Sequence, residues 1–138
     1  MKKILLIALM SVAVFSCTKD ETEPVVPTPT TTNAAAGNWT ISTYDGLTLA
    51  APAAGTLNMT STSATEGTAH FDLTFDGSTH NIEDDTYVLS NSNANIVYTK
   101  TGGTYNVLNG GGTWTINTMN ATTLKITSAN GLIIECTK

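Results

Sequence analysis

Apolar and polar residues alternate with a period of two through most of the chain after residue 36. One polar residue separates Trp39 from Ile41, and single polar residues also separate Phe71, Leu73 and Phe75. This alternation is typical of half-buried antiparallel strands, whereas no apolar stripe keeps helical spacing for three turns. Similar runs surround residues 57–59, 87–89, 96–98, 105–107, 114–116, 124–126 and 132–134. The pattern predicts an all-β domain of eight or nine strands.

Turn-forming residues stand between these runs. Glycine and asparagine enter positive-φ turns at low cost, so short turns between successive strands favour a meander. Closing a meander into a barrel removes exposed edge strands; a sandwich is the alternative, but its Greek-key crossings need longer connections. The turn signals are Asp45-Gly46, Asp76-Gly77, Gly102-Gly103, the glycines at 110–112 and Asn130-Gly131. We expect residues 36–138 to form one antiparallel β-barrel domain, because roughly 100 residues suffice for a single core.

The first 16 residues have the features of a signal peptide. Lys2 and Lys3 provide a charged start, and residues 4–15 form an apolar stretch. That stretch is shorter than the roughly 20 residues that a membrane-spanning helix needs. Residues 17–35 then combine three prolines with threonines and acidic residues, and this composition predicts a disordered tether with polyproline stretches.

Cys17 lies where the apolar stretch ends, directly after a small residue. The run Val14-Phe15-Ser16-Cys17 resembles the lipobox of bacterial lipoproteins. In that family cleavage falls before the cysteine, the thiol becomes a diacylglyceryl thioether, and the new amino group receives an acyl chain such as palmitate. The resemblance implies that Cys17 is the lipidation site and that the membrane is a partner through this acyl anchor. An ordinary signal peptide with a free cysteine nearby is the alternative.

The residues after Cys17 indicate in which membrane the protein is anchored. Thr18 stands where enterobacterial lipoproteins retained in the inner membrane carry aspartate, and Lys19-Asp20-Glu21 resembles the export signal of Bacteroidetes surface lipoproteins. The same three residues also suit a solvated tether. The resemblance implies a protein that is lipid-anchored in the outer membrane, on the cell surface.

Charge excludes one class of partner. Removal of residues 1–16 leaves four lysines against eleven acidic residues, a side-chain balance of −7, and the chain has no arginine. Such a surface repels phosphate, so we expect no nucleic-acid partner. With Cys17 acylated, Cys136 has no partner for an intramolecular disulfide, and its place in an apolar run predicts a buried thiol.

The strand-forming part of the chain resembles a known family. Gly37-Asn38-Trp39 resembles the Gly-X-Trp that opens the first strand of lipocalins, and residues 112–116, 124–127 and 131–135 resemble the closing strands of the lipocalin-like lipoproteins of Bacteroidetes. The resemblance implies an eight-stranded up-and-down barrel with an apolar interior. Lipocalins stack a late arginine over this tryptophan; here only Lys125 or Lys138 would take that place.

The inward-facing residues decide what such a barrel does. An eight-stranded barrel is filled by its own side chains or holds one small ligand. An aromatic lining with few charges suits an apolar or amphipathic ligand such as a lipid or a small aromatic molecule, and a filled core is the alternative. The candidate lining consists of Trp39, Ile41, Met59, Phe71, Leu73, Phe75, Tyr87, Tyr98, Tyr105, Trp114 and Ile126.

The sequence offers little for catalysis. His70 and His80 flank Asp72 and Asp76, which would suit a metal site on the outer face of one hairpin, but outward strand residues of this kind usually meet only water. The run 83–85 of Glu-Asp-Asp lacks the spacing of an EF-hand loop, and we expect it to form a solvated turn. No motif supplies an activated nucleophile, a phosphate-binding loop or a redox pair, so we expect no enzyme, no metal and no cofactor.

Three functions therefore stay open. The first is a lipocalin-like barrel that binds a small apolar molecule near the membrane. The second is a surface interaction module for protein or glycan, with Tyr44, Val88, Val97 and Ile133 as an outward apolar patch. The third, an enzyme, has the least support.

Overall fold

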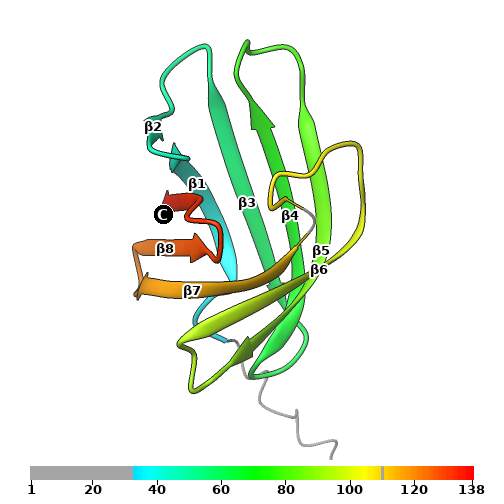
Figure 1. Cartoon of the computed structure of the whole chain (residues 1–138), viewed down its shortest axis with the longest axis vertical. Helices are drawn as coiled ribbons and strands as arrows, with labels where there is room; N and C mark the ends of the chain where they lie inside the picture. The colour runs from blue at the N-terminus through cyan, green and yellow to red at the C-terminus, as the bar shows by residue number, and fades with distance from the viewer. Residues whose placement is uncertain (1–32, 110) are drawn as a thin grey trace, which may run out of the picture.

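The computed structural model describes residues 33–109 and 111–138, all of which lie in strands or connections (Figure 1). No helix of this part is long and apolar enough to cross a bilayer. The expectations for the signal peptide, for Cys17 and for most of the tether fall on residues 1–32, outside the described residues. The strands are β1 (Gly37–Tyr44), β2 (Leu47–Thr48), β3 (Ala54–Ser61), β4 (Glu66–Thr74), β5 (Asn81–Ser90), β6 (Asn95–Gly103), β7 (Gly112–Met119), β8 (Thr123–Ser128) and β9 (Ile133–Thr137).

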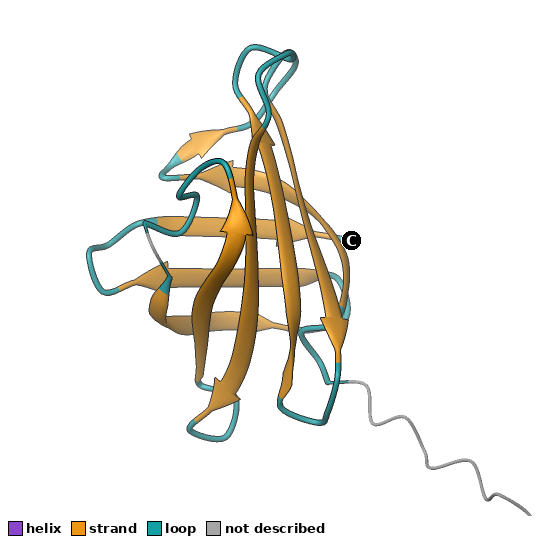
Figure 2. Ribbon diagram, turned by 90° about the vertical axis from the view of Figure 1, so that its right-hand side faces the viewer, coloured by secondary structure: helices purple, strands orange, loops and turns teal. Residues whose placement is uncertain are grey.

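These strands form one closed antiparallel barrel. Each strand from β3 to β8 pairs with the next, β1 pairs with β3, and β1 also pairs with β9, which closes the barrel. The two-residue β2 pairs with β1 alone, so eight strands form the wall and one is additional. Figure 1 shows β3, β4 and β5 running along the molecule while β7 and β8 cross it, and Figure 2 shows the same two strand directions from the side. The prediction of an all-β meander closed into a barrel is confirmed.

Strand alternation places one set of side chains inside. On β5, for example, Tyr87 and Leu89 are buried while Thr86 and Val88 face water. A residue of this parity loses nearly all its contact with solvent because the barrel encloses it on every side. Nine of the eleven residues expected in the interior are buried: Trp39, Ile41, Met59, Phe71, Leu73, Tyr87, Tyr98, Trp114 and Ile126.

The expectation that Phe75 and Tyr105 face the interior is wrong. They are 45% and 49% exposed. Strand β4 ends at Thr74, whose hydroxyl accepts a hydrogen bond from the Gly77 amide in a turn, so the alternation stops before Phe75. No strand forms around Tyr105, because β6 ends at Gly103 with a φ of 92° and the chain turns over the barrel.

One end of the barrel is closed by the residues just before β1. The Trp39 indole donates a hydrogen bond to the Ala35 carbonyl oxygen at 2.8 Å, and the Lys138 ammonium lies 3.9 Å from the centre of the Trp39 ring. Lys138 thus takes the stacking position, whereas Lys125 pairs with Glu135 on the wall. A cation over an indole face is attracted by the ring quadrupole.

The folded part begins earlier than residue 36. Asn33 and Ala35, which the sequence placed in the tether, are buried. The Tyr87 hydroxyl donates to Asn33 Oδ1 at 2.9 Å, and the Ala36 amide donates to the same oxygen. These bonds hold the segment against the end of the barrel, so the domain includes residues 33–35.

Candidate ligand-binding site

The other end of the barrel is covered by residues 104–109, between β6 and β7. We call this end the mouth; Tyr44, Thr74 and Asn81 mark where β1 and β4 finish and β5 starts. The Tyr105 amide donates to the Ile82 carbonyl oxygen, and the segment then buries Val107 and Leu108. Figure 1 shows this connection in yellow, folding back towards the strands.

Apolar side chains surround the mouth on its solvent side. We call Tyr44, Leu47, Phe75 and Tyr105 the rim cluster. The Tyr44 ring packs edge-on against Phe75 at 6.0 Å, its hydroxyl donates to the Val107 carbonyl oxygen, and Leu47 pairs with it in the β1–β2 register. Burial, then the nearby Tyr105, Asp45 and Glu83, raise the pKa of Tyr44 to about 12. Of the four most exposed large apolar side chains in the described chain, only Val88 lies elsewhere.

Two acidic side chains lie inside the barrel below the mouth. Glu83 and Asp85 are 0% and 1% exposed, on β5 and not in a solvated turn as expected. They share the parity of Tyr87 and Leu89, and an unbroken alternation along β5 turns all four inward. Counting back from Tyr87 in steps of two would have found both acids in the sequence.

The hydrogen bonding of these acids is incomplete. The Leu108 amide donates to Glu83 Oε2 at 2.8 Å, but Glu83 Oε1 and both Asp85 oxygens have no partner within the described chain. Burial and the negative charge of Glu83 raise the pKa of Asp85 to about 7, although Lys100 partly opposes this. A buried polar atom without a partner costs free energy, and such atoms concentrate at functional sites.

The lysine beside the acids gives its hydrogen bonds elsewhere. Lys100 lies opposite Asp85 in the β5–β6 register. Its ammonium group donates to the Tyr105 carbonyl oxygen and to Asn106 Oδ1 in the segment that covers the mouth. The charge of Lys100 acts on Asp85 from a distance, but it provides no hydrogen bond to either acid.

A β-bulge accompanies the acids. The register between β5 and β6 shifts between Asp84 and Asp85, so that Thr101 has no counterpart. The Gly102-Gly103 pair, expected in a turn, instead ends β6 opposite Asp84 and Glu83. A Cβ at Gly103 would lie 2.3 Å from the Ile82 carbonyl oxygen, so only glycine fits there.

Aromatic rings lie beside the acids. Tyr98 contacts Phe71, Tyr87 and Trp114 with ring centres 5.6, 6.4 and 6.4 Å apart. Its hydroxyl is buried without a partner in the described chain, and burial, then Cys136, Asp85 and Tyr87, raise its pKa. The interior below the mouth therefore combines carboxylates, an unpaired hydroxyl and aromatic rings.

The histidines form two separate pairs on the outer wall. His70 Nδ1 lies 2.6 Å from Asp84 Oδ1, and His80 Nδ1 lies 2.7 Å from Asp72 Oδ1. Asp76 instead accepts hydrogen bonds from the Ser78 and Thr79 amides within its own turn. Within residues 33–109 and 111–138, no three His, Cys, Asp or Glu side chains lie close enough together to hold a metal ion.

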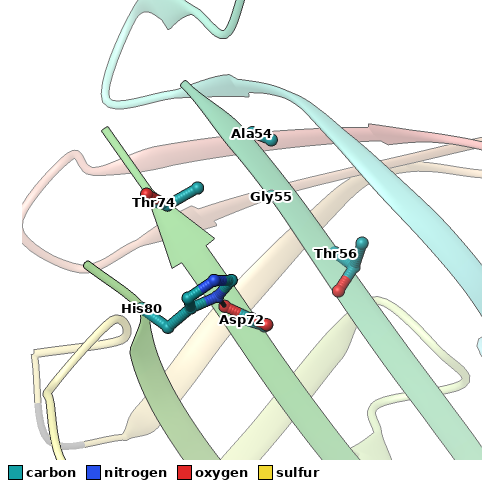
Figure 3. A pocket seen from close by; sticks show the side chains of 6 residues that line it. All are labelled: Ala54, Gly55, Thr56, Asp72, Thr74 and His80. Atoms are coloured by element: carbon teal, nitrogen blue, oxygen red, sulfur yellow. Dashed lines mark hydrogen bonds and ion pairs between the residues drawn. The ribbon is translucent and has the colours of Figure 1, made fainter. Parts of the chain in front are cut away.

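Two shallow hollows mark the outer wall. Figure 3 shows one, of about 130 Å³, whose lining includes the His80 ring and the neighbouring Asp72. The other, of about 280 Å³, lies between β1 and β3 and is lined by residues that include Asn38, Thr40 and Asn58. Both are open to solvent and carry mainly short polar and small side chains.

The remaining sequence candidates lie apart from the mouth or at its edge. Cys136 is buried, as expected, and burial raises its pKa to about 12, which keeps the thiol unreactive. Val88 and Val97 face each other on the outer wall, whereas Ile133 lies near Tyr44, since its carbonyl oxygen accepts from the Asp45 amide. The expected outward patch of Tyr44, Val88, Val97 and Ile133 is therefore split between two separate positions on the barrel.

Comparisons with known proteins add nothing to the residues described above, so a function for this protein has to be argued from those residues. A scan against protein-family models found no match, and neither the search of curated proteins nor the search of solved structures found one.

Proposed function

We propose that the chain is a membrane-anchored, non-catalytic binding protein whose lipocalin-like barrel takes a small apolar or amphipathic molecule at its mouth. The rim cluster is the observation that supports this most directly. Exposed apolar groups gathered at one end of a barrel are typical of surfaces that bind a partner or a small molecule. Val107 and Leu108 fill the entrance between the rim and the acids, where the apolar part of a ligand would make contact.

A fluorescent apolar probe tests this proposal. We expect N-phenyl-1-naphthylamine to gain fluorescence with the purified protein, and the double variant Phe75→Ser, Tyr105→Ser to weaken its binding at least tenfold, because both side chains are exposed at the mouth. Val88→Ser is the matched control, since Val88 is exposed to a similar degree on the wall. Equal binding by all three proteins would contradict a site at the mouth.

The membrane anchor is a separate part of the proposal. We infer acylation of Cys17 and anchoring to the outer membrane, at the cell surface, from the lipobox-like run before it. We expect mass spectrometry of the membrane-extracted protein to show the added acyl mass on a peptide that begins at Cys17. Cys17→Ser should abolish this mass and release the protein from the membrane fraction; a variant that stays membrane-bound would contradict the anchor.

A surface interaction module for protein or glycan is the second candidate. The two hollows on the outer wall favour it, because asparagine and threonine side chains at an open surface suit hydrogen bonding to sugar hydroxyls. In the probe experiment this candidate predicts no binding at the mouth. Loss of partner binding after Asn38→Ala and Asn58→Ala would then locate the partner on β1 and β3.

A further inference from the structure

The fold does not require carboxyl groups at positions 83 and 85 of the interior. Replacing Glu83 and Asp85 by apolar residues would remove the desolvation cost of two carboxyl groups in the interior. Three of their four oxygens accept no hydrogen bond within the described chain, and the neighbouring Tyr98 hydroxyl is likewise buried and unpaired. Four oxygen atoms below one mouth therefore have unused hydrogen-bonding capacity.

On this basis, and resting on the proposed function of the mouth, we propose that Glu83, Asp85 and the Tyr98 hydroxyl form a subsite for a primary ammonium group carried on an apolar or aromatic body. An ammonium offers three N–H donors and one positive charge, which matches acceptors that are unpaired and negatively charged. The apolar body would lie towards Val107, Leu108 and the rim cluster.

The aromatic surroundings fit the same ligand class. Tyr98 is the centre of a group of rings with Phe71, Tyr87 and Trp114. Rings attract a cation through their faces, most strongly where water is excluded, so carboxylates and aromatic rings together favour an organic cation. Ala69, whose side chain is a single methyl group, is the buried residue opposite Asp85 on β4.

A divalent cation fits less well. Calcium takes six to eight oxygen ligands, and magnesium demands an octahedral set. Here two carboxyl groups come without a third acidic, histidine or cysteine side chain near enough to complete a metal site, as far as the described residues extend. Lys100 is the nearby protein cation, but two of its three donors bond the Tyr105 carbonyl oxygen and Asn106 Oδ1.

Calorimetric titration of the full chain with 2-phenylethylamine at pH 8 and low salt tests the subsite. We expect the amine to bind at least tenfold more tightly than 2-phenylethanol, which has the same ring and no charge. Asp85→Asn should weaken amine binding at least tenfold and leave alcohol binding unchanged. Asp84→Asn should leave both unchanged, because Asp84 faces outward on the same strand and pairs with His70.

The possible results separate the subsite from the mouth. Equal binding of amine and alcohol, or an Asp85→Asn variant that binds the amine as the native protein does, would overturn the ammonium subsite. Tighter binding of Ca²⁺ than of the amine, lost in Asp85→Asn, would also overturn it. Failure of the subsite alone leaves N-phenyl-1-naphthylamine bound at the mouth, whereas failure of the proposed function abolishes that binding too. Glu83→Gln provides a second variant should Asp85→Asn not fold.

Discussion

Asp85→Asn is expected to stabilise the protein at pH 8 and to remove part of its pH dependence. The Asp85 carboxyl group is buried beside Glu83, and burial is the main reason that its pKa rises to about 7 from an ordinary value of 3.8. At about 1.4 kcal/mol per pKa unit, ionisation of Asp85 costs the folded state on the order of 2 to 4 kcal/mol. Urea unfolding at pH 5 and pH 8 measures the difference.

The direction in which stability changes with pH follows from proton binding to Asp85. Between about pH 4 and pH 7 the folded state holds a proton on Asp85 that the unfolded state has lost, because the folded pKa is the higher one. The free energy of unfolding therefore falls as the pH rises through this window. Below it both states are protonated and the cost disappears; above it the cost is complete.

The control for this prediction is Asp84→Asn. Asp84 is partly exposed and pairs with His70 at the surface, so its replacement should leave the pH dependence of Asp85 in place. The neutral amide at position 85 removes the charge but stays buried, which makes the stated gain an upper range. A variant whose unfolding free energy changes with pH as steeply as that of the native protein would refute a costly ionisation at Asp85.

Trp39→Ala is expected to destabilise the barrel by about 3 to 5 kcal/mol, as large-to-small changes of buried aromatic residues do. Trp39 is 2% exposed, its indole N–H bonds the Ala35 carbonyl oxygen, and Lys138 covers its ring. Removal of the side chain therefore takes away packing, a hydrogen bond and the contact that closes this end. A shift in the midpoint of urea unfolding, followed by circular dichroism, measures the loss.

Two variants divide this effect into parts. Trp39→Phe keeps most of the ring but cannot bond the Ala35 carbonyl oxygen, so a loss of roughly 1 to 2 kcal/mol is expected. Lys138→Met removes the cation from above the ring and should cost about 0.5 to 1 kcal/mol. If Trp39→Ala lost no more than Lys138→Met, the closed end would contribute little to stability.

The fold was largely predictable because its information is local. Period-two alternation depends on neighbouring residues alone, and it located the strands and nine of eleven interior side chains. The prediction of burial failed at Phe75 and Tyr105, because the end of a strand depends on turn hydrogen bonds and on where the next segment packs. The choice of Lys138 over Lys125 depended on which lysine reaches the start of β1, which the alternation does not encode.

The candidate site was less predictable than the fold. Composition placed Glu83 and Asp85 in water because carboxylates are rarely buried unless they are paired. Their parity with Tyr87 already pointed inward, so two rules conflicted, and the one based on strand geometry prevailed. The covering of the mouth by Val107 and Leu108 involves contacts between residues far apart in sequence, such as Leu108 with Glu83, and short-range patterns do not contain them.

The docking of Asn33 and Ala35 at the closed end fixes where the described chain enters the barrel. The chain enters the barrel beside Trp39, whereas the rim cluster and the acids lie towards the opposite ends of the strands. Any attachment made upstream of residue 33 therefore holds the barrel by its base and leaves the mouth at the far end. With the anchor that we propose at Cys17, the point of attachment and the proposed binding site would lie at opposite ends of the barrel.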